Sequence, residues 1–303
     1  MEYKLSDEDA RIYISLMFEG YLNRKAEKRL YSKDGIPQEI IREYYKSVKR
    51  PDFDVLARNF KNRYMYNENK LEDVHPKEEQ KGLLKAYEFI FENADLNNIT
   101  IDNLTDIHEL IYSKTEHPEA AREYRNHDGV ITEYDIDITP YYMITSEMNK
   151  LRRSDEDNKK WHVYIEENEK GINVPDILEK GLKAKQTGDV ELLLEYIEDC
   201  VKLHCKITKI HPFRDGNGRA ARVFLNLMFR YVNIPPTYIE NREKQKYNEA
   251  LRNAQTYGNF ADIINFYMYK ICDSIIALDV KLREDNNIYI DGKRINKSGK
   301  LSR

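Results

Sequence analysis

The sequence predicts a mostly α-helical protein that carries one short β-hairpin. Glycine and proline, the residues that most readily end a helix, are few, with 12 Gly and 9 Pro among 303 residues. Apolar residues recur at helical spacing through most of the chain. Residues 128–145 depart from this pattern, because β-branched and aromatic residues alternate with polar ones, bracketed by Asp-Gly and Thr-Pro pairs. Since 41% of the residues are hydrophobic, the chain can build one large or two small domains.

The N-terminal part of the chain is expected to be a separate helical segment, residues 1–59. Its first helix covers residues 7–22, with Ser6 as N-cap and acidic residues in the first turn. Pro37 fits the first position of a second helix, and Pro51 begins a third. We expect this segment to pack on the domain that follows.

The rest of the chain is expected to form a core domain, residues 60–283, followed by a mobile polar tail, residues 284–303. Four main helices are expected in the core domain. Pro76 opens the first and Asp102 caps the second. The other two cover residues 189–208 and 260–283. The charged and interrupted stretch 154–173 is expected to be an insertion or a long loop.

Composition excludes several classes of partner. The formal net charge of −4 gives no long-range attraction to nucleic acid. No run of eighteen apolar residues is present, and the polar, acidic N-terminus lacks the apolar region of a signal peptide. We therefore expect no membrane partner. The three cysteines form no CxxC pair, which fits reduced thiols and a cytoplasmic location.

Residues 211–222, His-Pro-Phe-Arg-Asp-Gly-Asn-Gly-Arg-Ala-Ala-Arg, concentrate reactive side chains in twelve positions. His211 can accept a proton near neutral pH, because an unperturbed histidine has a pKa of about 6.5. Asp215 offers the hard oxygen ligand that Mg²⁺ prefers. A base and a metal ligand therefore stand four residues apart.

The second half of the same stretch is suited to phosphate. Gly216-Asn217-Gly218 lets the backbone approach an anion and direct N–H groups at it. A strong helix pattern follows, so these residues lie at a helix N-terminus, which favours anions. Arg219 and Arg222 are three apart and share one helix face. Together these parts predict transfer of a phosphate-linked group to a hydroxyl; a capped helix with surface arginines is the plainer alternative.

This stretch matches HxFx[DE]GNGRxxR at every specified position, and the chain therefore resembles the Fic family over about residues 60–270. The resemblance implies a Fic-type helical bundle and transfer of AMP from ATP, with Mg²⁺, to a Tyr, Thr or Ser hydroxyl of a target protein. It makes His211 the catalytic base and Asp215 the metal ligand. The residues that it implies for nucleotide binding are Arg214, Gly216, Asn217, Gly218, Arg219, Arg222 and Tyr247.

Two of these assignments have alternatives. Tyr247 belongs to a Tyr-x-x-Ala-Leu pattern that borders the base in the family, so it either stacks on adenine or only packs in its helix. His204 stands seven residues before His211, where a buried structural role is favoured over a catalytic one. Phe213 is expected to anchor the loop in the core.

In Fic proteins a hairpin called the flap precedes the motif and holds the target's backbone by strand addition. Residues 128–145 have the position of this flap. The preceding element, Ala121-Arg122-Glu123-Tyr124-Arg125, lacks the glycine of the family's GxYR-like pattern. The expected partners are thus ATP and a hydroxyl-bearing protein docked on the flap, and a homodimer is left open.

Many Fic proteins also carry an inhibitory glutamate, in the pattern [ST]xxxE[GN], that pairs with the second arginine of the motif. Residues 15–20 fit this pattern fully and make Glu19 one candidate. Residues 66–73 fit its usual context and make Glu72 the favoured one, although Glu68 replaces the serine and Asp73 the glycine. That neither glutamate acts as a brake is the third alternative.

The intact Gly-Asn-Gly favours AMP transfer, with self-modification, over the altered loops of Doc kinases and phosphocholine transferases. Two other functions remain open. One is a Fic-fold enzyme that removes AMP or transfers another phosphate-linked group. The other is a nucleotide-binding regulatory module with negligible turnover, which would have no need of His211 as a base.

Overall fold

The computed structural model describes the core of the chain. The described residues are 41, 61, 64–72, 77–113, 115, 118–131, 136–285, 289–290 and 293–294. Apart from Ile41, the predicted N-terminal segment, including Glu19, lies outside the described residues. In the predicted tail, β3 (Tyr289–Ile290) and β4 (Lys293–Arg294) form an antiparallel pair.

The protein is mostly α-helical, as the spacing of apolar residues predicts. Residues 64–71 are helical. The helices that follow are α5 (Lys77–Glu88), η1 (Phe89–Asn93), α6 (Asp102–Tyr112), η2 (Pro118–Ala120), η3 (Tyr141–Met143), α7 (Ile144–Arg152), α8 (Asp155–Lys160), η4 (Glu167–Glu169), α9 (Val174–Thr187), α10 (Val190–Ile210), α11 (Asn217–Tyr231), η5 (Asn241–Glu243), α12 (Lys244–Tyr257) and α13 (Ala261–Asp285).

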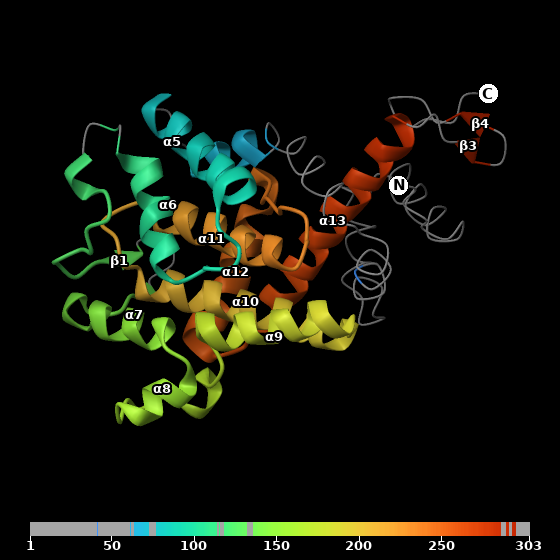
Figure 1. Ribbon diagram of the computed structural model, residues 1–303. Helices are drawn as coiled ribbons and strands as arrows, with labels where there is room; N and C mark the ends of the chain where they lie inside the picture. Colours follow the sequence, from blue (N-terminus) through green and yellow to red (C-terminus); the bar gives the residue numbers. More distant parts are fainter. Residues whose placement is uncertain are drawn as a thin grey trace.

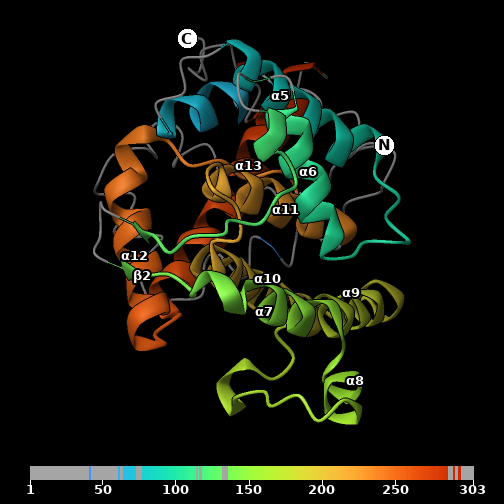
Figure 2. The ribbon, with the colours of Figure 1, turned by 90° about the vertical axis from the view of Figure 1, so that its left-hand side faces the viewer.

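Helix α11 is the centre of the bundle. Figures 1 and 2 place it in the middle of the molecule, with α5 and α6 on one side and α9 and α10 on the other. It packs directly on α6 and α10. Almost every residue of α11 is buried, including five polar ones, Asn217, Arg219, Arg222, Asn226 and Arg230. A helix that is buried on all sides needs partners for its polar side chains, and these partners define the site described below.

Helix α10 leads the chain into that site. Asp189 caps its first turn by accepting hydrogen bonds from the N–H groups of Glu191 (2.9 Å) and Leu192 (3.1 Å). The apolar residues of α10 face α9 and α11, so the helix is anchored from both sides. It ends at His211, which has the left-handed conformation φ 50°, ψ 58°. This turn stops the helix and redirects the chain towards α11.

The hairpin is shorter than predicted. Strands β1 (Val130–Ile131) and β2 (Ile136–Asp137) pair antiparallel, but residues 141–145 are helical and do not extend the strand. Pro140 cannot donate a ladder hydrogen bond, and the side chain of Asp128 accepts one from the N–H of Tyr141 (3.0 Å). The chain therefore turns into η3 and α7 after the flap.

Two other local predictions need correction. The helix expected after Pro76 begins as α5 but continues as the π-helix η1. Asp102 is the first residue of α6, and its cap position is Ile101. The stretch 154–173, expected to be an insertion or a long loop, contains the short helices α8 and η4. Within the described part of the chain, no helix is both long and apolar enough to cross a membrane.

Candidate active site

The loop between α10 and α11 is held by one arginine from the flap side. Arg125 donates hydrogen bonds from its guanidinium to four main-chain carbonyls. Nε binds the carbonyl of His211 (2.8 Å), Nη1 that of His127 (2.8 Å), and Nη2 those of Ile210 (3.3 Å) and Thr139. A single side chain thus joins the end of α10 to the segment that follows the flap.

Asn217 closes the loop from within. Its Oδ1 accepts from the N–H of Phe213 (2.8 Å), and its Nδ2 donates to the carbonyl of the same residue (2.8 Å). Phe213 itself is fully buried, as expected of a loop anchor. Both polar atoms of the Asn217 side chain therefore hold the loop together.

His108 of α6 supports the same loop and was not singled out from the sequence. Its Nε2 donates to the carbonyl of Asp215 (3.0 Å), so Nδ1 is the acceptor for the N–H of Arg122 (3.2 Å). The ring stacks on Phe213, with centroids 3.8 Å apart, and on Tyr112. Burial lowers the pKa of His108 to about 4, which keeps the ring neutral at pH 7.

Gly216 is required by its neighbour as well as by its backbone. It has φ 73°, in the left-handed region that glycine tolerates best. A Cβ at this position would also collide with the ring of Tyr112. The loop therefore lies against α6. The first N–H groups of α11 lack intrahelical partners.

Arg219 is buried and paired. Its Nη1 donates to Oε2 of Glu79 (2.6 Å), and Nη2 donates to the hydroxyl of Tyr112. The side chain is 4% exposed. One carboxylate and one hydroxyl from α5 and α6 therefore orient the first arginine of the motif.

Arg222 is shared between two glutamates. Its Nε donates to Oε2 of Glu68 (2.7 Å), and Nη2 donates to Oε1 of Glu72 (2.6 Å). A Cβ added to Gly218 would come within 2.9 Å of Glu72 Oε1 and 3.0 Å of Arg222 Nη1. The favoured inhibitory candidate thus lies directly over the glycine loop. A pair with one glutamate was expected, and two carboxylates share the guanidinium.

The two glutamates have different electrostatic states. Burial raises the pKa of Glu68, and the charge and hydrogen bond of Arg222 offset this only in part. Burial acts on Glu72 in the same direction, but the charge and hydrogen bond of Arg222 outweigh it and hold the pKa of Glu72 below its ordinary value. Glu72 is therefore a carboxylate at neutral pH.

Tyr247 lies inside the helical core. Its side chain is 3% exposed, and its hydroxyl hydrogen-bonds Nε2 of His204 (2.9 Å). Its ring packs against Phe266 and Tyr267. This placement corresponds to the packing alternative and not to stacking on an adenine. His204 is also buried, and burial lowers its pKa to about 3.

Three side chains of the motif, those of His211, Arg214 and Asp215, are at least partly accessible to solvent. His211 is partly buried, and Arg214 and Asp215 are exposed. Burial lowers the pKa of His211, and the charge of Arg125 adds to this, so the imidazole is a neutral base at pH 7. Asp215 Oδ1 accepts from the N–H of Gly216 (2.6 Å), which orients the carboxylate.

The chemistry of Asp215 fits Mg²⁺ when a nucleotide supplies further ligands. Within the described ranges, no group of three or more His, Cys, Asp or Glu side chains could hold a metal ion. Mg²⁺ in phosphate sites is commonly held by one or two carboxylates, phosphate oxygens and water. A single exposed carboxylate beside an anion-binding loop agrees with that mode.

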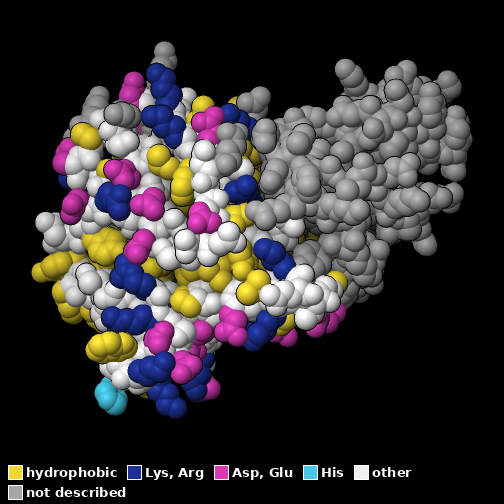
Figure 3. Space-filling view, in the orientation of Figure 1, with side chains coloured by type: hydrophobic (Ala, Val, Ile, Leu, Met, Phe, Trp, Pro, Cys, Tyr) yellow, Lys and Arg dark blue, Asp and Glu magenta, His cyan; other side chains and the backbone are white. Residues whose placement is uncertain are grey.

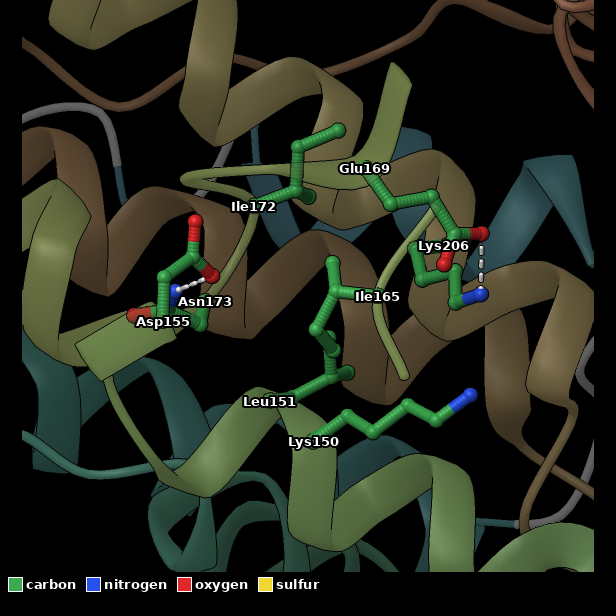
Figure 4. A pocket seen from close by; sticks show the side chains of 8 residues that line it. All are labelled: Lys150, Leu151, Asp155, Ile165, Glu169, Ile172, Asn173 and Lys206. Atoms are coloured by element: carbon green, nitrogen blue, oxygen red, sulfur yellow. Dashed lines mark hydrogen bonds and ion pairs between the residues drawn. The ribbon is translucent and has the colours of Figure 1, made fainter. Parts of the chain in front are cut away.

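A separate small cavity lies between α7, α10 and the segment around η4. Figure 4 shows Leu151, Ile165 and Ile172 around it, with an ion pair between Lys206 and Glu169 at one side. Its free volume of about 10 Å³ is close to that of one water molecule. No residue of the motif lines it, so it is not the candidate site.

Exposed apolar side chains lie beside the flap. Tyr141, Tyr142 and Met143 in η3 are 43%, 72% and 40% exposed. Figure 3 shows hydrophobic side chains gathered along the left-hand edge of this view, where Figure 1 places β1 and α7.

Comparison with known proteins gives the same architecture. The sequence model of the Fic/DOC family matches residues 98–229. The chain is 27% identical over 193 residues to a protein adenylyltransferase Fic from Nematostella vectensis. That match covers 61% of this chain but 36% of the relative, so the chain spans about a third of the length of this curated relative.

Solved structures agree in fold. The chain superposes on Fic-1 from C. elegans with a TM-score of 0.58 at 18% identity, covering 90% of this chain and 82% of that one. A Fic-domain-containing signaling protein from Bacteroides thetaiotaomicron gives a TM-score of 0.57 at 19% identity, covering 84% and 97%. The residues that match the sequence model of the family, 98–229, include the whole loop between α10 and α11 and most of α11. Residues 98–229 therefore match the Fic/DOC family, and the chain shares the fold of solved Fic proteins.

Proposed function

We propose that this protein is a nucleotidyltransferase that moves AMP from ATP to a hydroxyl of a target protein. The observation that carries the proposal is the placement of His211. A neutral imidazole stands at the end of α10, beside the N-terminus of α11, where the backbone at Gly216 and the guanidiniums of Arg219 and Arg222 would meet the phosphates. Curated relatives named protein adenylyltransferases support the same activity.

The reaction follows from these positions. His211 accepts the proton of a Tyr, Thr or Ser hydroxyl while its oxygen forms a bond to the α-phosphorus of ATP. The bond from the α-phosphorus to the bridging oxygen breaks in line, and pyrophosphate leaves. N–H groups at the start of α11 stabilise the negative charge that develops on the α-phosphate oxygens. Asp215 would hold Mg²⁺, which neutralises charge on the phosphates.

Two residues of the predicted nucleotide site are left out of direct contact. Asn217 is committed to Phe213, and Tyr247 to His204. Arg219 and Arg222 are retained, because each presents a guanidinium at the first turns of α11. Arg214 is exposed on the loop.

Regulation by Glu72 belongs to the same proposal. Its carboxylate occupies Arg222 Nη2 and lies over Gly218, so it competes with a γ-phosphate for the same guanidinium. ATP then binds in a pose that does not support transfer until Glu72 leaves. Self-modification, docking of the target on β1 and β2, a homodimer and a cytoplasmic location stay predictions.

Transfer of label from α-³²P-ATP to protein tests the proposal. The wild type and a Glu72→Gly variant should become labelled, and His211→Ala should lose the label by about 10²–10⁴-fold while ATP binding is nearly unchanged. Mass spectrometry of labelled proteins identifies the target. ATP binding without label in every variant would instead indicate a nucleotide-binding module, and release of AMP from modified proteins would indicate AMP removal.

A further inference from the structure

The inference concerns the second carboxylate on Arg222 and rests on the proposed function. Glu68 and Glu72 lie one helical turn apart and bind different nitrogens of the same guanidinium, Nε at 2.7 Å and Nη2 at 2.6 Å. The inhibitory pattern places Ser or Thr where this chain has Glu68. A role for one glutamate therefore leaves the other unexplained.

Exposure separates the two glutamates. The side chain of Glu68 is 0% exposed, whereas that of Glu72 is 35% exposed. Tyr64, which precedes Glu68 by one turn, is also completely buried. A carboxylate in this position cannot move into water without opening the core, and an uncompensated buried charge is costly. Glu72 can leave Arg222 for solvent, and Glu68 cannot.

The geometry of the guanidinium indicates what the contact between Glu68 and Arg222 Nε does. The group is planar and rigid, so a bond at Nε fixes the direction of both terminal nitrogens. With Nε held by Glu68, Nη1 lies beside Gly218 and Nη2 is the nitrogen that Glu72 occupies. When Glu72 leaves, Nη2 loses its carboxylate and can donate to a phosphate oxygen instead.

We propose that Glu68 is a positioning residue that holds Arg222 towards the nucleotide, so Glu68 supports transfer while Glu72, one turn later, opposes it. The substrate group recognised by this arrangement is the terminal phosphate of a nucleoside triphosphate. The two carboxylates thus act in opposite directions on one arginine.

Substitutions at position 68 in a Glu72→Gly background test this assignment. Glu68→Met removes the acceptor at similar volume, and Glu68→Gln keeps an acceptor without the charge. Relative to Glu72→Gly alone, we expect Glu68→Met to lower kcat/KM for ATP about 10- to 100-fold, chiefly through KM, because a charge-assisted hydrogen bond orients the binding group. Glu68→Gln should lie between. Glu78→Met, at an exposed position of α5, is the control and should have no effect.

The outcomes separate this inference from the proposed function. Labelling equal to or above that of Glu72→Gly in both position-68 variants would overturn the inference, since Glu68 would then be a second brake or a spectator. Absence of label in every variant would overturn the proposed function, and calorimetric titration with ATP would still decide the inference. In that titration both variants should weaken binding; unchanged affinity overturns the assignment. If Glu68→Met does not fold, Glu68→Gln alone gives the same decision.

Discussion

Two arginines flank the candidate active site and are held in different ways. On the flap side, Arg125 donates to main-chain carbonyls of Ile210, His211, His127 and Thr139. On the nucleotide side, Arg222 donates to side-chain carboxylates. One arginine is therefore satisfied by neutral groups of the backbone, and the other by the side chains of one buried and one partly exposed glutamate.

This difference divides the site into a fixed part and an adjustable part. A carbonyl belongs to the chain itself and cannot turn away, so Arg125 fixes the position of His211 relative to the flap. A carboxylate can exchange for another anion, and a phosphate is the anion that the first turn of α11 favours. Exchange is expected at Arg222, where Glu72 is partly exposed, and not at Arg125.

The largest expected effect is a loss of stability when Arg222 is replaced. Arg222→Met would leave Glu68 as a buried carboxylate without its partner, and loss of one member of a buried pair costs about 3–5 kcal/mol. Urea denaturation followed by circular dichroism measures this loss. In the double variant Arg222→Met/Glu68→Gln the charge is absent, so part of the stability should return. No recovery in the double variant would show that the charge of Glu68 is not the cause.

The next largest effect is expected when Arg125 is replaced. Arg125→Met leaves buried neutral carbonyls unpaired and should cost about 1–3 kcal/mol of stability, less than the change at Arg222. Transfer should also fall, with the dissociation constant for ATP unchanged, because the flap and His211 lose their connection. Arg125→Lys retains a charge but not the planar fork, and should recover little. A weakened ATP affinity in Arg125→Met would contradict the separation of the two parts.

A smaller effect, of opposite sign, is expected from Glu72. Glu72→Gly removes the partly exposed competitor for Arg222, and self-modification should rise about tenfold, which corresponds to about 1.4 kcal/mol. Labelling with α-³²P-ATP measures the change. Glu19→Gly is the control, and the wild-type rate is expected for it. A rise in Glu19→Gly alone would assign the brake to the N-terminal segment.

The smallest effect is a shift in pH dependence. Burial lowers the pKa of His211, so the neutral form that accepts a proton persists below the ordinary histidine value of about 6.5. The acid limb of kcat against pH should therefore lie below that value. Arg125→Met removes a nearby positive charge that lowers this pKa, and the limb should move to higher pH. An unchanged limb in this variant would show that Arg125 acts on the position of His211 alone.

The chemistry of the site is almost entirely local in sequence. His211, Asp215, Gly216, Arg219 and Arg222 fall within twelve residues, and their spacing around one helix start is set by short-range geometry. The long helices were predictable for the same reason, since apolar periodicity repeats within each. The hairpin lies where the sequence predicts it but is shorter than predicted, because Asp128 and Pro140 turn the chain into η3.

The partners of these residues were decided by tertiary packing. His108 and Tyr112 reach the loop from α6, Glu79 from α5, and Arg125 from the flap side, each across at least 86 positions of the chain. Glu72 was inferred from a resemblance in context, whereas Glu68 looked only like a missing serine. A buried polar group requires a partner, but which distant side chain supplies it depends on how the helices pack, and no local periodicity records that arrangement.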